Sequence, residues 1–232
     1  MTDEKTPDPL GSFDDALSAG LKRWSIPIDA DRLGRLRAHY QAMVETNRTV
    51  NLTRIVEPTE AACKHYVDSL ALILWADSAD TPQACRLLDV GTGAGLPAVP
   101  LAVMRREWTV TAIDSTRKKI DFLRRLTDEL GLDNLAVVHA RAEHWNVSER
   151  FHIVTSRAVA RLSKGLGQSA RLVAPGGYLV AYKTASTSRE ETDEANEQTR
   201  KLNLVAKKPF DYDLVVGDEV LHRRLLIYRK KR

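Results

Sequence analysis

The sequence predicts an α/β fold: a mostly parallel, seven-stranded sheet with a helical extension at its N-terminus. From residue 86 to residue 182, short apolar segments alternate with helical ones, which is the pattern of a parallel sheet covered by helices. A glycine-rich loop follows the first of these apolar segments, at residues 91–97. Amphipathic helical segments precede the first strand. Together these observations favour a doubly wound sheet that holds a nucleoside-containing cofactor.

The N-terminal third predicts a short tail and then helices. Residues 1–11 are expected to be disordered, because they are acidic and contain prolines. Helices are predicted at Phe13–Trp24, Ala30–Asn47 and Glu57–Trp75, where apolar residues recur at helical spacing. We therefore divide the chain into a tail (1–11), a helical extension (12–80) and a sheet domain (81–232).

The remaining chain alternates between strands and helices. Strands are predicted at 86–90, 109–113, 135–139, 151–155, 178–182, 203–209 and 221–228. Helices are predicted at 97–105, 116–130, 163–173 and 188–201. Pro97 suits the first turn of its helix, because the missing N–H would have no partner there. The last two strands follow a polar helix and are expected to form an antiparallel edge.

Composition limits the class of protein. The chain has 232 residues, of which 43% are hydrophobic, but no apolar run approaches the ~20 residues that a membrane span needs. The start of the chain has no secretory signal pattern. Cys63 and Cys85 lie in unlike contexts, which predicts reduced thiols and a cytoplasmic protein. No large apolar stripe is visible, so a monomer is expected, and no metal-ligand spacing is evident.

The net charge of +4 is unevenly distributed. Seven bases lie between Lys22 and Arg54, and six lie between Arg223 and Arg232 with no acid among them. The predicted helix at 116–130 carries five more. Such clusters suit a phosphate backbone, although solvated helix faces carry similar charge.

The segment from Asp89 to Pro97 reads D-V-G-T-G-A-G-L-P. Its glycines allow the backbone to approach a ligand at the start of a helix, although they could also make only a tight turn. A dinucleotide fingerprint counted from Gly91 needs Gly or Ala at position 96, where this chain has Leu96. The spacing D-x-G-x-G-x-G favours S-adenosylmethionine and argues against a nicotinamide-dependent dehydrogenase.

Acidic residues at the strand ends predict how such a cofactor would lie. Asp89 is expected near the ammonium group of its methionine part. Asp114 ends the second strand, where it can accept hydrogen bonds from the ribose hydroxyls. The third strand is expected to end near the adenine, which makes Ala142 and Glu143 the candidate contacts there.

The residues after the fourth and fifth strands narrow the acceptor. Adenine amine methylation often uses an Asp/Asn-Pro-Pro-aromatic motif, but residues 155–158 read T-S-R-A. Pyrimidine C5 methylation needs a nucleophilic cysteine, and neither Cys63 nor Cys85 is well placed. Arg157 and Lys183 are basic side chains that can bind phosphate groups. They also fit a methyl acceptor that loses no proton in the reaction, such as guanine N7. A small-molecule methyltransferase and a non-catalytic RNA-binding module remain alternatives.

Residues 40–185 resemble the glucose-inhibited-division B family of bacterial ribosomal RNA guanine-N7 methyltransferases. The matching segments are Asn51-Leu52-Thr53, His65–Leu70, Leu88–Pro97, Asp114-Ser115, Lys118-Lys119, Ser156-Arg157-Ala158 and Lys183. The resemblance implies a Rossmann-like class I methyltransferase fold and S-adenosylmethionine as methyl donor. It also implies 16S ribosomal RNA as substrate, in the small ribosomal subunit or an assembly intermediate, with guanine 527 of the 530-loop region as acceptor.

The resemblance also assigns roles to residues. It places the cofactor against Asp89, Gly91, Thr92, Gly93, Gly95, Leu96, Asp114, Ser115, Ala142, Glu143 and Arg157. It places RNA against Asn51, His65, Asp68, Lys118, Arg141, Lys183 and Arg223, and makes Arg157 and Lys183 catalytic. Two positions depart from the family pattern, which usually has glycine where this chain has Ala98 and Thr184. We expect the methyl group of Ala98 to narrow the approach to the cofactor.

Overall fold

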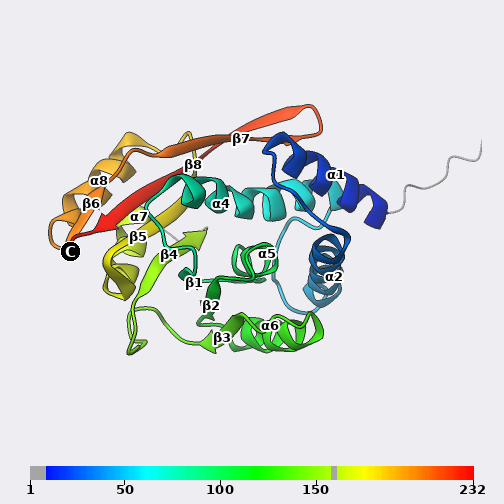
Figure 1. Ribbon diagram of the computed structural model, residues 1–232, viewed down its shortest axis with the longest axis horizontal. Helices are drawn as coiled ribbons and strands as arrows, with labels where there is room; N and C mark the ends of the chain where they lie inside the picture. Colours follow the sequence, from blue (N-terminus) through cyan, green and yellow to red (C-terminus); the bar gives the residue numbers. More distant parts are fainter. Residues whose placement is uncertain (1–8, 158–160) are drawn as a thin grey trace, which may run out of the picture.

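The computed structural model of the chain describes residues 9–157 and 161–232 (Figure 1). Within these residues, one eight-stranded sheet has the order β3-β2-β1-β4-β5-β8-β6, and β7 pairs with β8. The strands are β1 (Arg86–Val90), β2 (Thr109–Asp114), β3 (Leu135–His139), β4 (Phe151–Arg157), β5 (Val173–Thr184), β6 (Leu204–Ala206), β7 (Phe210–Val216) and β8 (Glu219–Lys230). Strands β1 to β5 are parallel, and β6 and β7 pair with β8 in antiparallel fashion. The predicted α/β fold with a mostly parallel sheet is confirmed.

The helices also follow the predicted order. They are α1 (Pro9–Arg23), α2 (Ala30–Asn47), α3 (Pro58–Ala61), the π-helix η1 (Ala62–Val67), α4 (Asp68–Ser78), α5 (Ala98–Met104), α6 (Arg117–Glu129), α7 (Leu162–Ser169), the 3-10 helix η2 (Ala170–Leu172) and α8 (Arg189–Thr199). Among the described helices, none is long and apolar enough to cross a membrane.

Several element limits differ from the prediction; the helix expected at 163–173 ends at Ser169 and β5 begins at Val173 rather than at 178, and three further differences change the description of the fold. Helix α1 begins at Pro9, so residues 9–11 are helical rather than part of a disordered tail, and residues 1–8 lie outside the described residues. The helix expected at 57–75 contains a π-helical turn at Ala62–Val67. The single strand expected near 203–209 is two strands, β6 and β7. Pro209 lies between them, and it has no N–H to donate to a neighbouring strand.

Alternate residues of the strands face two separate hydrophobic cores, as expected from the two-residue period of a strand. Leu87 and Val180 belong to the larger core, which also contains side chains from α1, α2, α4, α5 and α6. Leu88 and Leu179 face the smaller core on the other side, against α7 and the buried part of α8. The sheet is therefore covered on both faces, which is typical of parallel sheets.

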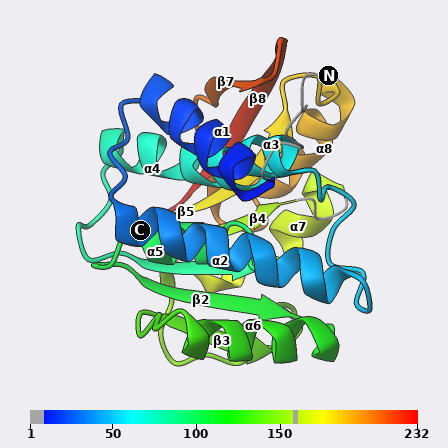
Figure 2. The same ribbon diagram turned by 90° about the vertical axis from the view of Figure 1, so that its right-hand side faces the viewer.

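The N-terminal helices share the larger core with the sheet. Phe13 of α1 is completely buried, stacks on Tyr40 of α2 with 4.5 Å between ring centroids, and meets Tyr66 of η1 edge-on at 4.9 Å. Figure 2 shows α2 lying between α1 and α6. Because one cluster of buried residues joins Phe13 to sheet residues such as Leu87, the helices stabilise the sheet and are stabilised by it.

We expect Phe13→Ala to destabilise the whole described fold. Removing a buried phenylalanine ring costs about 3–5 kcal/mol, and the shared core should spread this loss over helices and sheet alike. Denaturant unfolding followed by far-ultraviolet circular dichroism and by tryptophan fluorescence should give one earlier, coincident transition. Val220→Ala is the matched control, because Val220 is 49% exposed and its substitution should change stability little. A separate early transition of the N-terminal helices alone would contradict the shared core.

Candidate active site

The strand order reverses between β1 and β4, and this switch point places the glycine loop at the carboxyl edge of the sheet. The amides of Gly91 and Thr92 both donate to the carbonyl of Ile113 at the end of β2, at 2.8 and 3.0 Å. Gly91 and Gly93 have φ values of 72° and 60°, a left-handed conformation that other residues rarely adopt. The loop therefore crosses over the end of β2, next to Asp114.

Asp114 holds the loop and still presents acceptor capacity. Its Oδ2 accepts from the Gly93 amide at 3.0 Å, and its Oδ1 accepts from the Thr116 amide at 2.8 Å. Each carboxylate oxygen can accept a further hydrogen bond. Asp114 also lines a pocket of about 350 Å³, so both oxygens are suited to bind the hydroxyls of a ribose there.

Asp89 is a buried carboxylate without a hydrogen-bond partner among the described residues. It is completely buried, and neither of its oxygens makes a hydrogen bond of normal geometry; the hydroxyl of Thr92 is also unpaired in that part of the chain. Burial raises the pKa of Asp89 to about 6, opposed by the nearby Thr92 hydroxyl and by the charge of Arg157. A buried acid with free oxygens is suited to bind a cation. Asp89 does not line the pocket beside the glycine loop, so its contact with the ammonium group of S-adenosylmethionine stays a prediction that rests on its free oxygens.

The pocket beside the glycine loop contains some of the predicted cofactor contacts and not others. Five residues that we predicted to contact the cofactor line this pocket: Gly91, Asp114, Ser115, Ala142 and Glu143. Arg141, which we expected to contact RNA, lines it as well. Gln168 of α7 and Lys119 of α6 line it as well, and the sequence patterns did not single them out for the cofactor.

Two loop positions, Gly95 and Leu96, and the first residue of α5, Ala98, lie in the protein interior and do not line this pocket. A side chain at Gly95 would lie 2.7 Å from atoms of Val99 and Leu123, so glycine is needed there for packing. Leu96 is 6% exposed and belongs to the larger core. Ala98 is completely buried in the same core, so the expectation that its methyl group narrows the cofactor pocket is wrong.

A buried histidine supports the loop from behind. His39 of α2 contacts the Ala94 carbonyl through Nε2 at 2.8 Å, and Tyr66 of η1 contacts its Nδ1 at 2.7 Å. Burial lowers the pKa of His39 to about 4. The neutral ring therefore donates from Nε2 and accepts from the Tyr66 hydroxyl. The helical extension thus fixes the position of the cofactor loop.

A second, basic cleft of about 730 Å³ lies at the ends of β4 and β5. Its lining includes the predicted RNA-binding or catalytic residues His65, Arg157, Lys183 and Arg223, together with Lys64. Residues from η1, β4, β5 and β8 converge here although they lie far apart in the sequence. Arg157 lines this cleft and not the cofactor pocket, so its assignment as a direct cofactor contact is not supported by the pocket geometry.

Asp68 lies beneath the basic cleft and binds both arginines. It is completely buried; its carboxylate accepts from Arg223 Nε and Nη2 at 3.2 Å each, from Arg157 Nη1 at 3.3 Å, and from the Tyr212 hydroxyl at 2.8 Å. No surface of Asp68 is accessible, so the structure does not support its predicted contact with RNA. Its role is to position the guanidinium groups of the two arginines.

His65 is held in its neutral form. Arg157 Nη2 lies 3.2 Å from His65 Nδ1, and Thr53 Oγ1 lies 2.9 Å from Nε2. Since arginine only donates, Nδ1 accepts and Nε2 carries the proton. Burial and the charge of Arg157 lower the pKa of His65 to about 4. With both ring nitrogens engaged, His65 is a positioning group and not a general base.

Of the remaining predicted RNA contacts, Lys183 lines the basic cleft. Lys183 Nζ forms an ion pair with Glu191 of α8 at 2.7 Å, and the same carboxylate oxygen accepts from the Leu162 amide. Asn51 and Lys118 are exposed but line neither pocket, so their contact with RNA stays a prediction. Ala158 lies outside the described residues. No group of three or more metal-ligating side chains occurs within 9–157 and 161–232.

We expect the affinity for S-adenosylhomocysteine, which carries the same ammonium group, to fall by about tenfold per pH unit below pH ~6. Asp89 has its pKa at about 6 in the free protein, and only its carboxylate form attracts that ammonium group. Calorimetric titration between pH 5 and pH 8 measures this. Asp89→Asn should bind weakly at every pH and without the pH dependence. A constant affinity in the unmodified protein across this range would contradict the role of Asp89.

Comparison with solved structures supports the fold. The precorrin-6y C5,15-methyltransferase of Geobacter metallireducens superposes with a TM-score of 0.54 and 13% identity, covering 84% of this chain and 100% of that one. A methyltransferase from Pyrococcus furiosus superposes with a TM-score of 0.53 and 17% identity, covering 86% and 99%. At these identities the likeness establishes a class I methyltransferase fold.

Comparison with known sequences establishes the family. The ribosomal RNA small subunit methyltransferase G of Desulfitobacterium hafniense is 38% identical over 213 residues, which are 90% of this chain and 85% of that protein. The protein of the same name from Lactococcus lactis subsp. cremoris is 37% identical over 223 residues, 94% and 91% of the two chains. The sequence model of one family, rRNA small subunit methyltransferase G, matches residues 32–213. With its cofactor loop and basic cleft at one edge of the sheet, this chain belongs to the rRNA small subunit methyltransferase G family.

Proposed function

We propose that this protein transfers a methyl group from S-adenosylmethionine to N7 of a guanine in 16S ribosomal RNA. The observation that carries the proposal is the placement of a basic cleft at the same sheet edge as the glycine loop. Arg157 and Lys183 lie on neighbouring strands, because Arg157 pairs with Tyr182 in the register of β4 and β5. The small-molecule alternative would need an apolar lid over the cleft, whereas most of the described residues that line it are polar or charged in type.

The chemistry requires alignment rather than proton transfer. When bound, S-adenosylmethionine supplies an electrophilic methyl group on a positively charged sulfur. Guanine N7 has a free lone pair, so the new C–N bond forms as the S–C bond breaks, and the sulfur keeps that electron pair. No proton leaves the guanine ring. This agrees with a cleft in which His65 is locked as a neutral positioning group by Arg157 and Thr53.

Each group then has a distinct role. Asp89 binds the ammonium group of the cofactor, Asp114 binds its ribose, and the glycine loop keeps side chains out of its path. Lys183 and the two arginines held by Asp68 face the cleft, where they bind phosphate groups next to the target base. Correct placement of two reactants accounts for much of the rate enhancement in such a reaction.

The biological setting extends this proposal. We propose guanine 527 in the 530-loop region as the target, within the small ribosomal subunit or an assembly intermediate. A cytoplasmic monomer fits this substrate, and the two buried free cysteines, Cys63 and Cys85, fit a reducing compartment. The helical extension at 12–80 and the sheet domain at 81–232 would act together, because residues of both line the cleft.

Incubation with radiolabelled S-adenosylmethionine tests the proposed function. Small subunits from cells that lack this modification, naked 16S RNA and small-molecule acceptors are offered separately, and the labelled base is mapped by cleavage at N7-methylguanine. We expect label at a single guanine of the 530-loop region. Asp114→Ala serves as the inactive control, because it loses the ribose contacts. Label on another base or ring atom, or only on a small molecule, would refute the proposal.

A further inference from the structure

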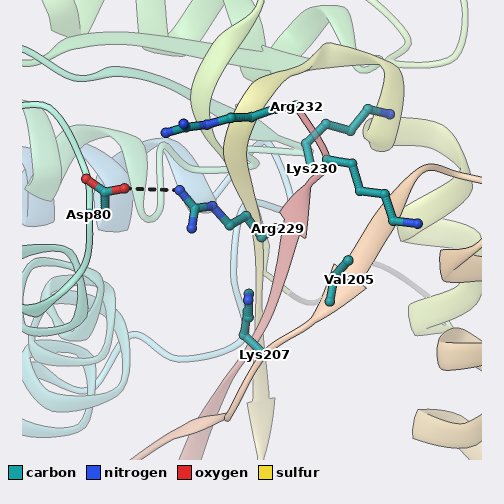
Figure 3. A pocket seen from close by; sticks show the side chains of 7 residues that line it. Asp80, Val205, Lys207, Arg229, Lys230 and Arg232 are labelled. Carbon is teal, nitrogen blue, oxygen red and sulfur yellow. Dashed lines mark hydrogen bonds and ion pairs between the residues drawn. The ribbon is translucent and has the colours of Figure 1, made fainter.

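A third pocket, of about 410 Å³, lies at the far end of β8 (Figure 3). Five of its seven lining residues are basic, and we call it the distal basic pocket. It is lined by Asp80, Val205, Lys207, Arg229, Lys230, Lys231 and Arg232. We propose that this pocket is a second binding surface for the phosphate backbone of the RNA substrate, separate from the cleft. The inference rests on the proposed function, because the RNA bound at this pocket is the substrate RNA that carries the target guanine.

The position of the pocket follows from the register of β8. In the antiparallel pair of β5 and β8, Thr184 lies opposite Arg223 and Tyr178 lies opposite Arg229. Arg223 therefore lies at the edge that holds the cleft, whereas Arg229 lies toward the opposite edge. From Arg223 to Lys230 the strand advances seven residues, or about 23 Å at roughly 3.3 Å per residue. One folded RNA can span both ends of such a strand.

Two of the basic residues form the base of the pocket. Arg229 donates to the Gly176 carbonyl at 3.2 Å, forms an ion pair with Asp80 at 3.0 Å, and lies over the ring of Tyr178. Figure 3 shows this arginine directed toward Asp80. Lys230 donates to the Leu202 carbonyl at 2.7 Å. These contacts fix the end of β8, from which Lys231 and Arg232 continue.

The other three basic side chains are free to bind an anion. Lys207, Lys231 and Arg232 are exposed, and their side chains make no hydrogen bond or ion pair with any residue that the structure describes. Asp80 is the one acid in the lining, and it is already paired with Arg229. Three unpaired cations around one hollow attract a polyanion, and lysine and arginine together are the usual phosphate contacts of RNA-binding proteins.

The test compares the triple variant Lys207→Ala, Lys231→Ala and Arg232→Ala with the unmodified protein. Binding of 16S ribosomal RNA is measured over a range of salt concentrations. We expect the variant to lose about tenfold or more in affinity at ~0.1 M salt. The slope of log affinity against log salt should become shallower by about 2 to 3, at roughly 0.7–0.9 per lost phosphate contact. Affinity for S-adenosylhomocysteine should be unchanged, because the cofactor pocket lies at the other edge.

A second triple variant controls for net charge. Arg106→Ala, Lys164→Ala and Arg189→Ala removes the same charge from three exposed residues on or next to α5, α7 and α8. This control should bind RNA as the unmodified protein does. An equal loss of RNA affinity in both triple variants would overturn the proposal. RNA affinity that is unchanged in the Lys207, Lys231 and Arg232 variant would also overturn it, and would leave an acidic protein as the partner of this pocket. Failure of the proposed function gives a different result: RNA is bound through the pocket, but no guanine N7 is methylated.

Discussion

The buried carboxylate of Asp68 is the interaction on which the reactive edge of this protein depends. It binds two arginines, from β4 and β8, and the hydroxyl of Tyr212 from β7. A buried charge is costly unless it is paired and hydrogen-bonded. Asp68 meets that condition through Arg157, Tyr212 and Arg223, which follow it in the sequence by 89, 144 and 155 positions. The carboxylate thereby fixes two guanidinium groups at the cleft, where each retains donors for phosphate.

The π-helix places the helical extension against both parts of the site. Tyr66 bonds to His39, which holds the glycine loop at Ala94, whereas the preceding residue, His65, contacts Arg157 at the cleft. A π-helical turn inserts a residue relative to an α-helix, and such turns are often found at functional sites. Two adjacent residues of one turn therefore reach both parts of the site: Tyr66 contacts His39, which supports the cofactor loop, and His65 contacts Arg157 at the cleft. We infer that the extension is an integral part of the enzyme and not an added module.

Much of this arrangement follows from the sequence, and the exceptions have physical causes. The strands at 86–90 and 135–139 agree with their predicted limits, because short apolar runs between turn residues are strong local signals. The glycine loop and Asp114 lie at the same edge, as expected, since adjacent parallel strands end there. The burial of Asp68 could not be predicted, because its partners come from β4, β7 and β8, far along the chain. Likewise, no local pattern marks His39 as the support of the glycine loop.

Asp68→Asn tests the central claim most directly, because it keeps the shape and the Tyr212 contact but removes the charge that binds both arginines. The measurement is the single-turnover rate of guanine N7 methylation in 16S ribosomal RNA, with S-adenosylhomocysteine affinity measured alongside. Without the charge of Asp68 the two guanidinium groups lose the contact that orients them at the cleft, so we expect the rate to fall by at least about tenfold, or about 1.4 kcal/mol of transition-state stabilisation. The cofactor affinity should stay within about twofold. An undiminished rate, or a parallel loss of cofactor affinity, would contradict the role of Asp68 in positioning the RNA-binding arginines.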